Sequence, residues 1–227
     1  MRYFLIILTI LAGTLLPAGA CAQEDYRFEA GGGIGMTGYL GDANTANLYK
    51  NPGVAGELVF RYIMNPRLAL RSNIFAGTLS GDTSQMTDVL PEQASFKFST
   101  TFFEASELFE FNFFNFGMGE QYRKLRRFTP YITGGLGLTV WTTEGYTGAA
   151  FTIPFGAGVK FKLKERLNIG AAFLMKKTFS DKLDGPALSD PHAIKSSFVK
   201  NTDWYSTLTV TLTYEFSKRC AVCNYKE

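Results

Sequence analysis

The sequence predicts an all-β fold, an eight-stranded antiparallel transmembrane β-barrel of the outer-membrane type with both termini in the periplasm. Three observations support this class. A strictly alternating run lies just before the C-terminus, an export signal opens the chain, and the connections between predicted strands sort into short and long ones. Bacterial single-chain barrels have even strand numbers from eight upward, with short periplasmic turns and longer outer loops. We therefore expect the protein in the outer membrane of a Gram-negative cell.

The run 208–216 is the predicted barrel-closure strand. Large apolar residues alternate there with threonines and Glu215, and successive side chains of a strand point to opposite faces. In a barrel that closes within lipid, the apolar face looks outward, and the first strand must pair with the last, because hydrocarbon tolerates no unpaired strand edge. The predicted outward face consists of Leu208, Val210, Leu212, Tyr214 and Phe216.

The N-terminus has the pattern of a cleaved secretory signal. A short positive start is followed by an apolar run over 4–16 and by the small-residue site Ala20-Cys21-Ala22. Lipid attachment at Cys21 is the alternative that this overlapping site leaves open. The predicted divisions are a signal peptide at 1–22, a barrel at 23–216 and a periplasmic tail at 217–227.

Composition agrees with this class. The chain has 23 glycines, 21 phenylalanines and 11 tyrosines, and its charged fraction is 19%, against roughly 25% in ordinary globular chains. No later stretch is long and apolar enough for a spanning helix. A formal net charge of +3 without a basic, aromatic-interleaved stripe argues against a nucleic-acid partner. We expect no cofactor and no metal.

Period-two alternation predicts the other strands. Asn65-Pro66 is a turn-forming pair between two of them. The least regular is 96–114, where Phe102-Phe103 breaks the alternation and Glu107 falls on the lipid face. We expect either a bulge near Phe102 or an error in the assignment of faces there. The predicted ranges are 28–39, 54–63, 68–77, 96–114, 130–141, 151–163 and 167–177.

The connections have two lengths. The joins at 65–66 and 164–166 are short, whereas 40–52, 79–94 and 180–203 are long and polar. The short joins are expected on the periplasmic side and the long ones outside. Alternation alone also fits a soluble, lipocalin-like cup, but the polar faces carry few solubilising charges and the alternating connection lengths favour the membrane barrel.

The predicted inward faces carry charges of both signs. An eight-stranded barrel is just wide enough for its own side chains to fill, so we expect an ion-paired plug rather than a diffusion pore. A conducting path or proton relay is the alternative. This predicted lumen charge network consists of Glu29, Glu57, Arg61, Arg71, Glu104, Glu110, Lys160, Lys162, Lys176 and Glu215.

Candidate chemistry is sparse. The single histidine, His192, lies on the longest predicted outer loop near serines, without a fixed geometry that would indicate a lipid hydrolase. We expect no enzyme activity. Cys220 and Cys223 stand in the tail, and an exported protein meets an oxidising compartment. They are expected to form either a local disulfide or a mixed disulfide with a partner.

Basic residues gather in the predicted periplasmic turns and tail. Contact with phospholipid head groups is one interpretation. The other is an acidic protein partner docked beneath the barrel, which would explain why the join 115–127 is longer than a turn needs. The predicted docking face consists of Arg123, Lys124, Arg126, Arg127, Lys218 and Arg219.

The middle and end of the chain resemble a known family, and the likeness spans Gly31 to Phe216. The block Glu110-Phe-Asn-Phe-Phe-Asn-Phe116, the segment 127–137 with Pro130-Tyr131, and the pieces 153–160 and 163–167 are similar to the PorG-like outer-membrane proteins of the type IX secretion system. The resemblance implies a structural barrel without catalytic residues. It also implies, as partners, a periplasmic ring lipoprotein and its partner subunit. An OmpA-like barrel for envelope integrity or adhesion, and a lipid-modifying enzyme, remain the alternatives.

Overall fold

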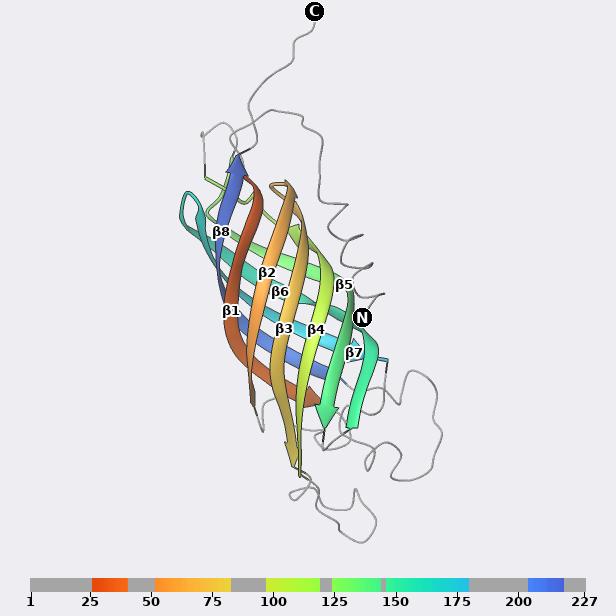
Figure 1. The fold of residues 1–227 in the computed structure, drawn as a ribbon. Helices are drawn as coiled ribbons and strands as arrows, with labels where there is room; N and C mark the ends of the chain where they lie inside the picture. Colours follow the sequence, from red (N-terminus) through yellow and green to blue (C-terminus); the bar gives the residue numbers. More distant parts are fainter. Residues whose placement is uncertain are drawn as a thin grey trace, which may run out of the picture. The chain divides into compact units, whose positions relative to one another are not determined.

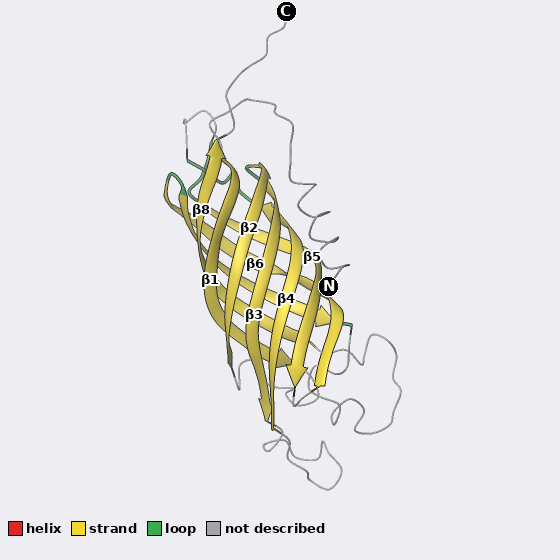
Figure 2. Cartoon of the chain, viewed as in Figure 1, coloured by secondary structure: helices red, strands yellow, loops and turns green. Residues whose placement is uncertain are grey.

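In the computed structural model, the protein is a closed barrel of antiparallel strands. The structure describes residues 26–40, 52–82, 97–118, 124–143, 146–179 and 204–218. Each strand pairs with the next along the chain, and the last strand closes on the first (Figure 1). The described elements are all strands or loops (Figure 2). The strands are β1 Tyr26–Leu40, β2 Gly53–Asn65, β3 Leu68–Asp82, β4 Lys97–Asn112, β5 Phe128–Thr143, β6 Tyr146–Lys164, β7 Leu167–Thr178 and β8 Trp204–Lys218.

The chain divides into two units. Arg27–Phe216 forms the barrel, and Met1–Tyr26 with Ser217–Glu227 forms the other, of which the structure describes only residues 26, 217 and 218. The predicted signal peptide and both tail cysteines therefore lie outside the described residues. Among those that are described, no helix is long and apolar enough to cross a membrane.

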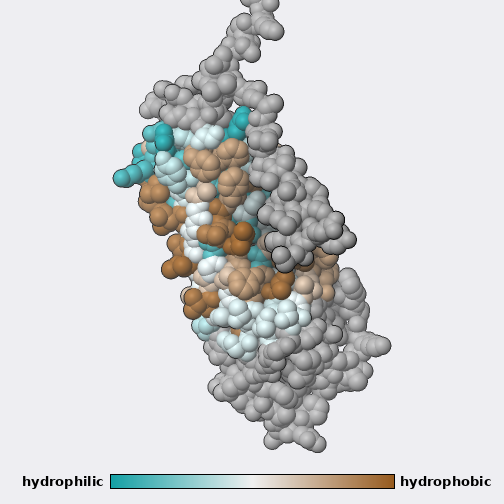
Figure 3. All heavy atoms as spheres, in the orientation of Figure 1, coloured by the Kyte–Doolittle hydropathy of each residue, from teal (hydrophilic) through white to brown (hydrophobic). Residues whose placement is uncertain are grey.

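The alternation read from the sequence sorts the side chains as predicted. On β8, Val210 is 50% exposed and Thr209 1% exposed, and the same two faces continue along β6 and β7. Apolar side chains cover much of the wall, as the brown surface in Figure 3 shows. Because the apolar faces look outward and the polar faces look inward, the lipocalin-like cup does not describe this fold.

Aromatic side chains mark both ends of the apolar wall. Near the seam between β1 and β8, the rings of Phe28, Phe60 and Phe216 pack together, with the Phe28 centroid 5.6 Å from that of Phe60 and 5.9 Å from that of Phe216. Toward the other end, Phe155 meets Trp204 edge to face at 6.0 Å. Girdles of aromatic residues at the two interfaces are typical of outer-membrane barrels.

The tight turns between β2 and β3 and between β6 and β7 lie at one end of the barrel, here called the turn end. The opposite end, where 41–51, 83–96, 144–145 and 180–203 join the strands, is called the loop end. In the first turn, the Asn65 side-chain oxygen accepts hydrogen bonds from the backbone N–H groups of Arg67 and Leu68, both at 2.8 Å. The predicted turn at Asn65-Pro66 is therefore confirmed.

The predicted bulge near Phe102 is wrong. β4 pairs with β3 and β5 without any shift of register, so Phe103 points outward and Phe102 inward, where it is fully buried. The apparent break in phase arises because the interior accepts an aromatic ring at this level. β3 also runs on to Asp82, beyond its predicted end at Gly77. Leu79, where the sequence placed a loop, is buried in the same cluster as Phe102.

The outward face of β8 should not tolerate a cation in lipid. Val210 lies midway between the aromatic residues Trp204 and Phe216, so Val210→Arg is expected to lower the free energy of unfolding by about 2–4 kcal/mol, the cost measured near a bilayer midplane. Urea titration in lipid vesicles measures it, with Val210→Leu as the matched control. Equal stability of the arginine and leucine variants would contradict the membrane placement of this face.

Candidate functional site: a filled interior and a basic turn end

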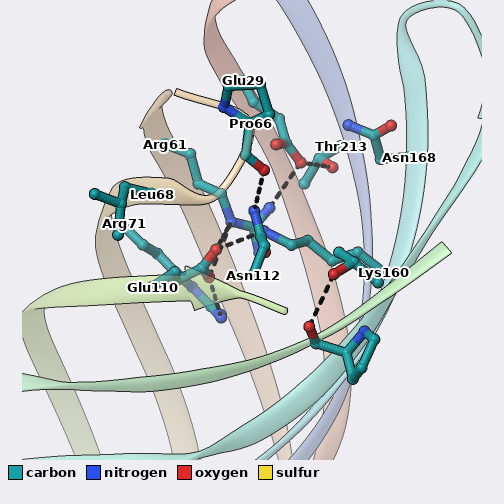
Figure 4. A network of polar contacts seen from close by, with 12 residues as sticks. Glu29, Arg61, Pro66, Leu68, Arg71, Glu110, Asn112, Lys160, Asn168 and Thr213 are labelled. Carbon is teal, nitrogen blue, oxygen red and sulfur yellow. Dashed lines mark hydrogen bonds and ion pairs between the residues drawn. The ribbon is translucent and has the colours of Figure 1, made fainter. Parts of the chain in front are cut away.

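Glu110 is the centre of the interior charge network. Its carboxylate is fully buried. The carboxylate oxygens lie 3.1 Å from the Arg61 Nε, 2.8 Å from the Lys160 Nζ and 3.4 Å from the Arg71 Nη1. These four residues come from four strands, β4, β2, β6 and β3, and converge in the turn-end half of the barrel (Figure 4). One acid therefore neutralises part of the charge of three bases.

The network continues to both sides through the arginines. The Arg61 Nη1 lies 2.7 Å from the Glu29 carboxylate, which also accepts a hydrogen bond from the Thr213 hydroxyl of β8. The Arg71 Nη2 lies 3.0 Å from the Glu57 carboxylate. Side chains from β1, β2, β3, β4, β6 and β8 are thereby joined across the interior, and neither arginine has only one acidic partner.

Two smaller ion pairs complete the interior. The Lys162 Nζ lies 2.5 Å from the Glu215 carboxylate near the turn end. Farther toward the loop end, the Lys176 Nζ lies 2.9 Å from the Glu104 carboxylate, which also accepts the Tyr205 hydroxyl at 2.5 Å. The structure thus places every predicted network residue inside the barrel. The interior acids are Glu29, Glu57, Glu104, Glu110 and Glu215, and the bases are Arg61, Arg71, Lys160, Lys162 and Lys176.

An aromatic cluster fills the loop-end half of the interior. The ring of Phe102 lies 5.6 Å from that of Phe75 and 5.2 Å from that of Tyr205, and Trp141 belongs to the same buried group. The Lys176 ammonium lies 4.1 Å from the centroid of Phe75, so the cluster touches the ion pairs directly. Filled from both halves, the interior has the character of a packed core.

Sequence reasoning missed these aromatic residues. An apolar residue that faces the interior and one that faces lipid look the same in a linear pattern. A usable signal was present in the glycines. A Cβ at Gly158 would come 2.6 Å from the Tyr131 ring, and one at Gly148 would come 2.5 Å from the Trp141 ring, so each glycine makes room for an inward aromatic residue on the neighbouring strand β5.

The join between β4 and β5 closes the turn end. Its described parts, 113–118 and 124–127, are held to the barrel by backbone hydrogen bonds, including Phe116 N–H to the Pro66 carbonyl at 3.1 Å and Lys162 N–H to the Arg127 carbonyl at 2.8 Å. The Lys162 and Lys160 ammonium groups lie 5.4 and 5.6 Å from the centroid of the Phe116 ring. We call the described parts of this join, 113–118 and 124–127, the closing segment; its Phe116 ring caps the interior lysines.

The closing segment carries three of the predicted docking residues on its surface. Lys124, Arg126 and Arg127 are exposed, and the Arg126 guanidinium lies 4.5 Å from the centroid of the Phe114 ring. The ring and a backbone hydrogen bond from Arg126 N–H to the Asn115 carbonyl, 2.7 Å, hold Arg126 in place. The remaining candidates lie outside the described residues or, for Lys218, have a side chain outside them: Arg123, Lys218, Arg219, Cys220, Cys223 and His192.

This arrangement defines the class of protein, which is a small closed barrel with a filled interior. The fold is that of outer-membrane barrels. The chain belongs to the family described as "Domain of unknown function (DUF6089)", whose model matches residues 2–225. No curated protein sequence matches the chain.

Solved outer-membrane barrels are among the structures that this chain matches. Neisserial surface protein A matches with a TM-score of 0.51 and 11% sequence identity, over 83% of this chain and 97% of that protein. Ail of Yersinia pestis, solved with a heparin analogue, has a TM-score of 0.49 and 10% identity over 85% of this chain and 100% of its own. OprG from Pseudomonas aeruginosa has a TM-score of 0.48 and 11% identity, over 86% and 98%. The likeness to the neisserial protein is one of fold.

Removing the central acid should destabilise the barrel. Glu110→Gln leaves three buried cations short of one negative charge, and breaking a buried ion pair costs about 3–5 kcal/mol. Urea titration of the refolded protein in detergent micelles measures the free energy of unfolding. Glu107→Gln, the same change on the same strand at an exposed position, is the matched control and should have little effect. Equal losses in the two variants would show that the network does not stabilise the fold.

Proposed function

We propose that this protein is a structural barrel of the Gram-negative outer membrane that acts through its ends and passes nothing through its interior. The observation that carries the proposal is the burial of balanced ion pairs and an aromatic cluster in the two halves of the interior. With the turn end in the periplasm and the longer connections outside, as in other outer-membrane barrels, the exposed basic residues of the closing segment face a periplasmic partner. This orientation is part of the proposal.

A filled interior predicts an electrically silent barrel. The purified protein, inserted into planar lipid bilayers, is expected to give no stable conductance steps, because the pairs around Glu110 and the rings around Phe102 block both halves of the path. A porin added to the same bilayer is the positive control for insertion and recording. Reproducible ohmic steps from this protein would reject the plug and favour the conducting path.

Two more specific roles fit such a barrel. The first is envelope integrity or adhesion, in the manner of small OmpA-like barrels; the shared fold with Neisserial surface protein A supports it, and it assigns function to the loop-end connections. The second is a structural component of the type IX secretion machinery that docks the periplasmic ring lipoprotein and its partner subunit. The resemblance of the 110–137 region supports the second role, as do the exposed cations on the closing segment.

Charge reversal on the closing segment tests the docking role. Changing Lys124, Arg126 and Arg127 together to glutamate is expected to abolish recovery of ring proteins in pull-downs from the native cell, because an acidic partner would then meet like charge. The matched control is Lys177→Glu, a single reversal toward the loop end, which should leave recovery unchanged. A second variant lacking 217–227 tests the contribution of the tail.

The outcomes separate the roles. Loss of ring proteins together with a defect in secretion of cargo proteins supports the secretion role. Unchanged recovery and normal secretion, with reduced adhesion or a leaky envelope in a strain lacking the protein, would favour the first role. Retained recovery of ring proteins in the charge-reversed variant would reject the closing segment as the docking surface.

A further inference from the structure

Glu107 is a carboxylate on the outer, apolar face of the barrel. It lies on β4 and points outward into the apolar wall, where its cross-strand neighbours are Ser72 on β3 and Leu136 on β5. Within the described residues, no hydrogen bond or ion pair reaches this side chain. Three residues farther along the same strand, Glu110 is fully buried and holds three cations, so β4 presents one satisfied and one unsatisfied carboxylate.

The depth of Glu107 in the membrane follows from its strand. Phe103 and Phe111, outward aromatic residues on β4, stand four positions to either side of it. With a rise of roughly 3.3 Å per residue and a tilt of about 45°, each of them is about 10 Å away in depth. An apolar band is about 25 Å tall, so the carboxylate lies in its middle part. Phospholipid head groups do not reach this depth.

The immediate surroundings leave room for an incoming side chain. Small outward positions border Glu107 on all three strands: Ser72, Ala105 and Gly134. Beyond them stand larger exposed apolar residues, with Ile74 60% and Leu136 69% exposed. Glu107 and its small neighbours therefore form a polar area of short side chains within an apolar surface. An ionisable group at such a depth is costly and commonly marks a contact or pathway in membrane proteins.

We propose that Glu107 is the recognition point of a lateral docking site, where a membrane-spanning segment of another protein places an arginine or lysine against the carboxylate. Charge complementarity selects this occupant. Such a pair, shielded from water, would be strong, and the small neighbours would admit a long cationic side chain. The site lies on the barrel wall and is separate from the closing segment, so it goes beyond the docking role proposed for the turn end.

A second copy of this chain does not fit the same site. A two-fold contact through β4 would bring two Glu107 carboxylates together. Among the described strand residues that are not at a strand terminus, the base that faces outward is Lys177, near the end of β7. Its ammonium group already lies 5.4 Å from the centroid of the Trp204 ring. It therefore lies closer to the loop end than Glu107 and has a partner of its own.

In-cell photo-crosslinking tests the proposal. A photoreactive residue at Ala105, beside the site, is expected to capture one defined membrane protein, whereas the same probe at Val210, across the barrel on β8, should not. Glu107→Gln should reduce the adduct by at least about tenfold, as expected when one partner of a buried charge pair is lost. Glu107→Arg should abolish it, and replacing the captured protein's membrane-embedded base with glutamate should restore it.

Several results would overturn the proposal. They are an adduct that Glu107→Gln leaves unchanged, an adduct with a second copy of this chain, and no protein adduct from Ala105. A stability control keeps the variants interpretable: Glu107→Leu in the purified barrel should be at least as stable as the parent, since no described side chain uses the carboxylate. A large loss of stability would assign Glu107 a role within the barrel instead. The probe tests the wall and charge reversal tests the turn end, so either proposal can fail alone.

Discussion

The Glu110 carboxylate and the three cations around it connect strands that are far apart in the chain. β-sheet hydrogen bonds tie each strand only to its neighbours, whereas these ion pairs cross the interior between β2, β3, β4 and β6. Removing charges from water is expensive, and it is tolerated here because each interior charge has at least one partner of opposite sign. The other interior groups pack against the ion pairs: the aromatic cluster contacts the Lys176 pair, and Phe116 covers the lysines at the turn end.

A barrel filled in this way has few places left for function. Its interior consists of its own side chains, and most of its wall is the apolar surface that the membrane requires. What remains are the two ends and any polar exception on the wall. The closing segment lies at such an end: backbone hydrogen bonds and the contact of Arg126 with Phe114 hold its described residues, and its cations are exposed. Glu107 is such an exception.

Two glutamates of β4 show that the role of a residue type depends on the face of the strand from which it points. Glu110 points inward, is paired and stabilises the fold. Glu107 points outward and contributes no described interaction. A family model that covers nearly the whole chain and a fold shared with Neisserial surface protein A describe the scaffold. The particular role has to come from these exposed groups, because the scaffold is common to barrels with different functions.

Alternation alone was sufficient to place the interior charges, from Glu29 on the first strand to Glu215 on the last, and to assign the outward face of β8. This information is local, because the side chain of each strand residue points to the opposite face from the next. It also placed Glu107 on the lipid face. Alternation could not tell whether Phe102 belonged inside or marked a bulge, since an interior aromatic residue depends on space left by glycines of other strands. Which acid meets which base, and the closure of the turn end by Phe116, were decided only by the tertiary structure, because the stagger and closure of the sheet determine which distant side chains face one another across the interior.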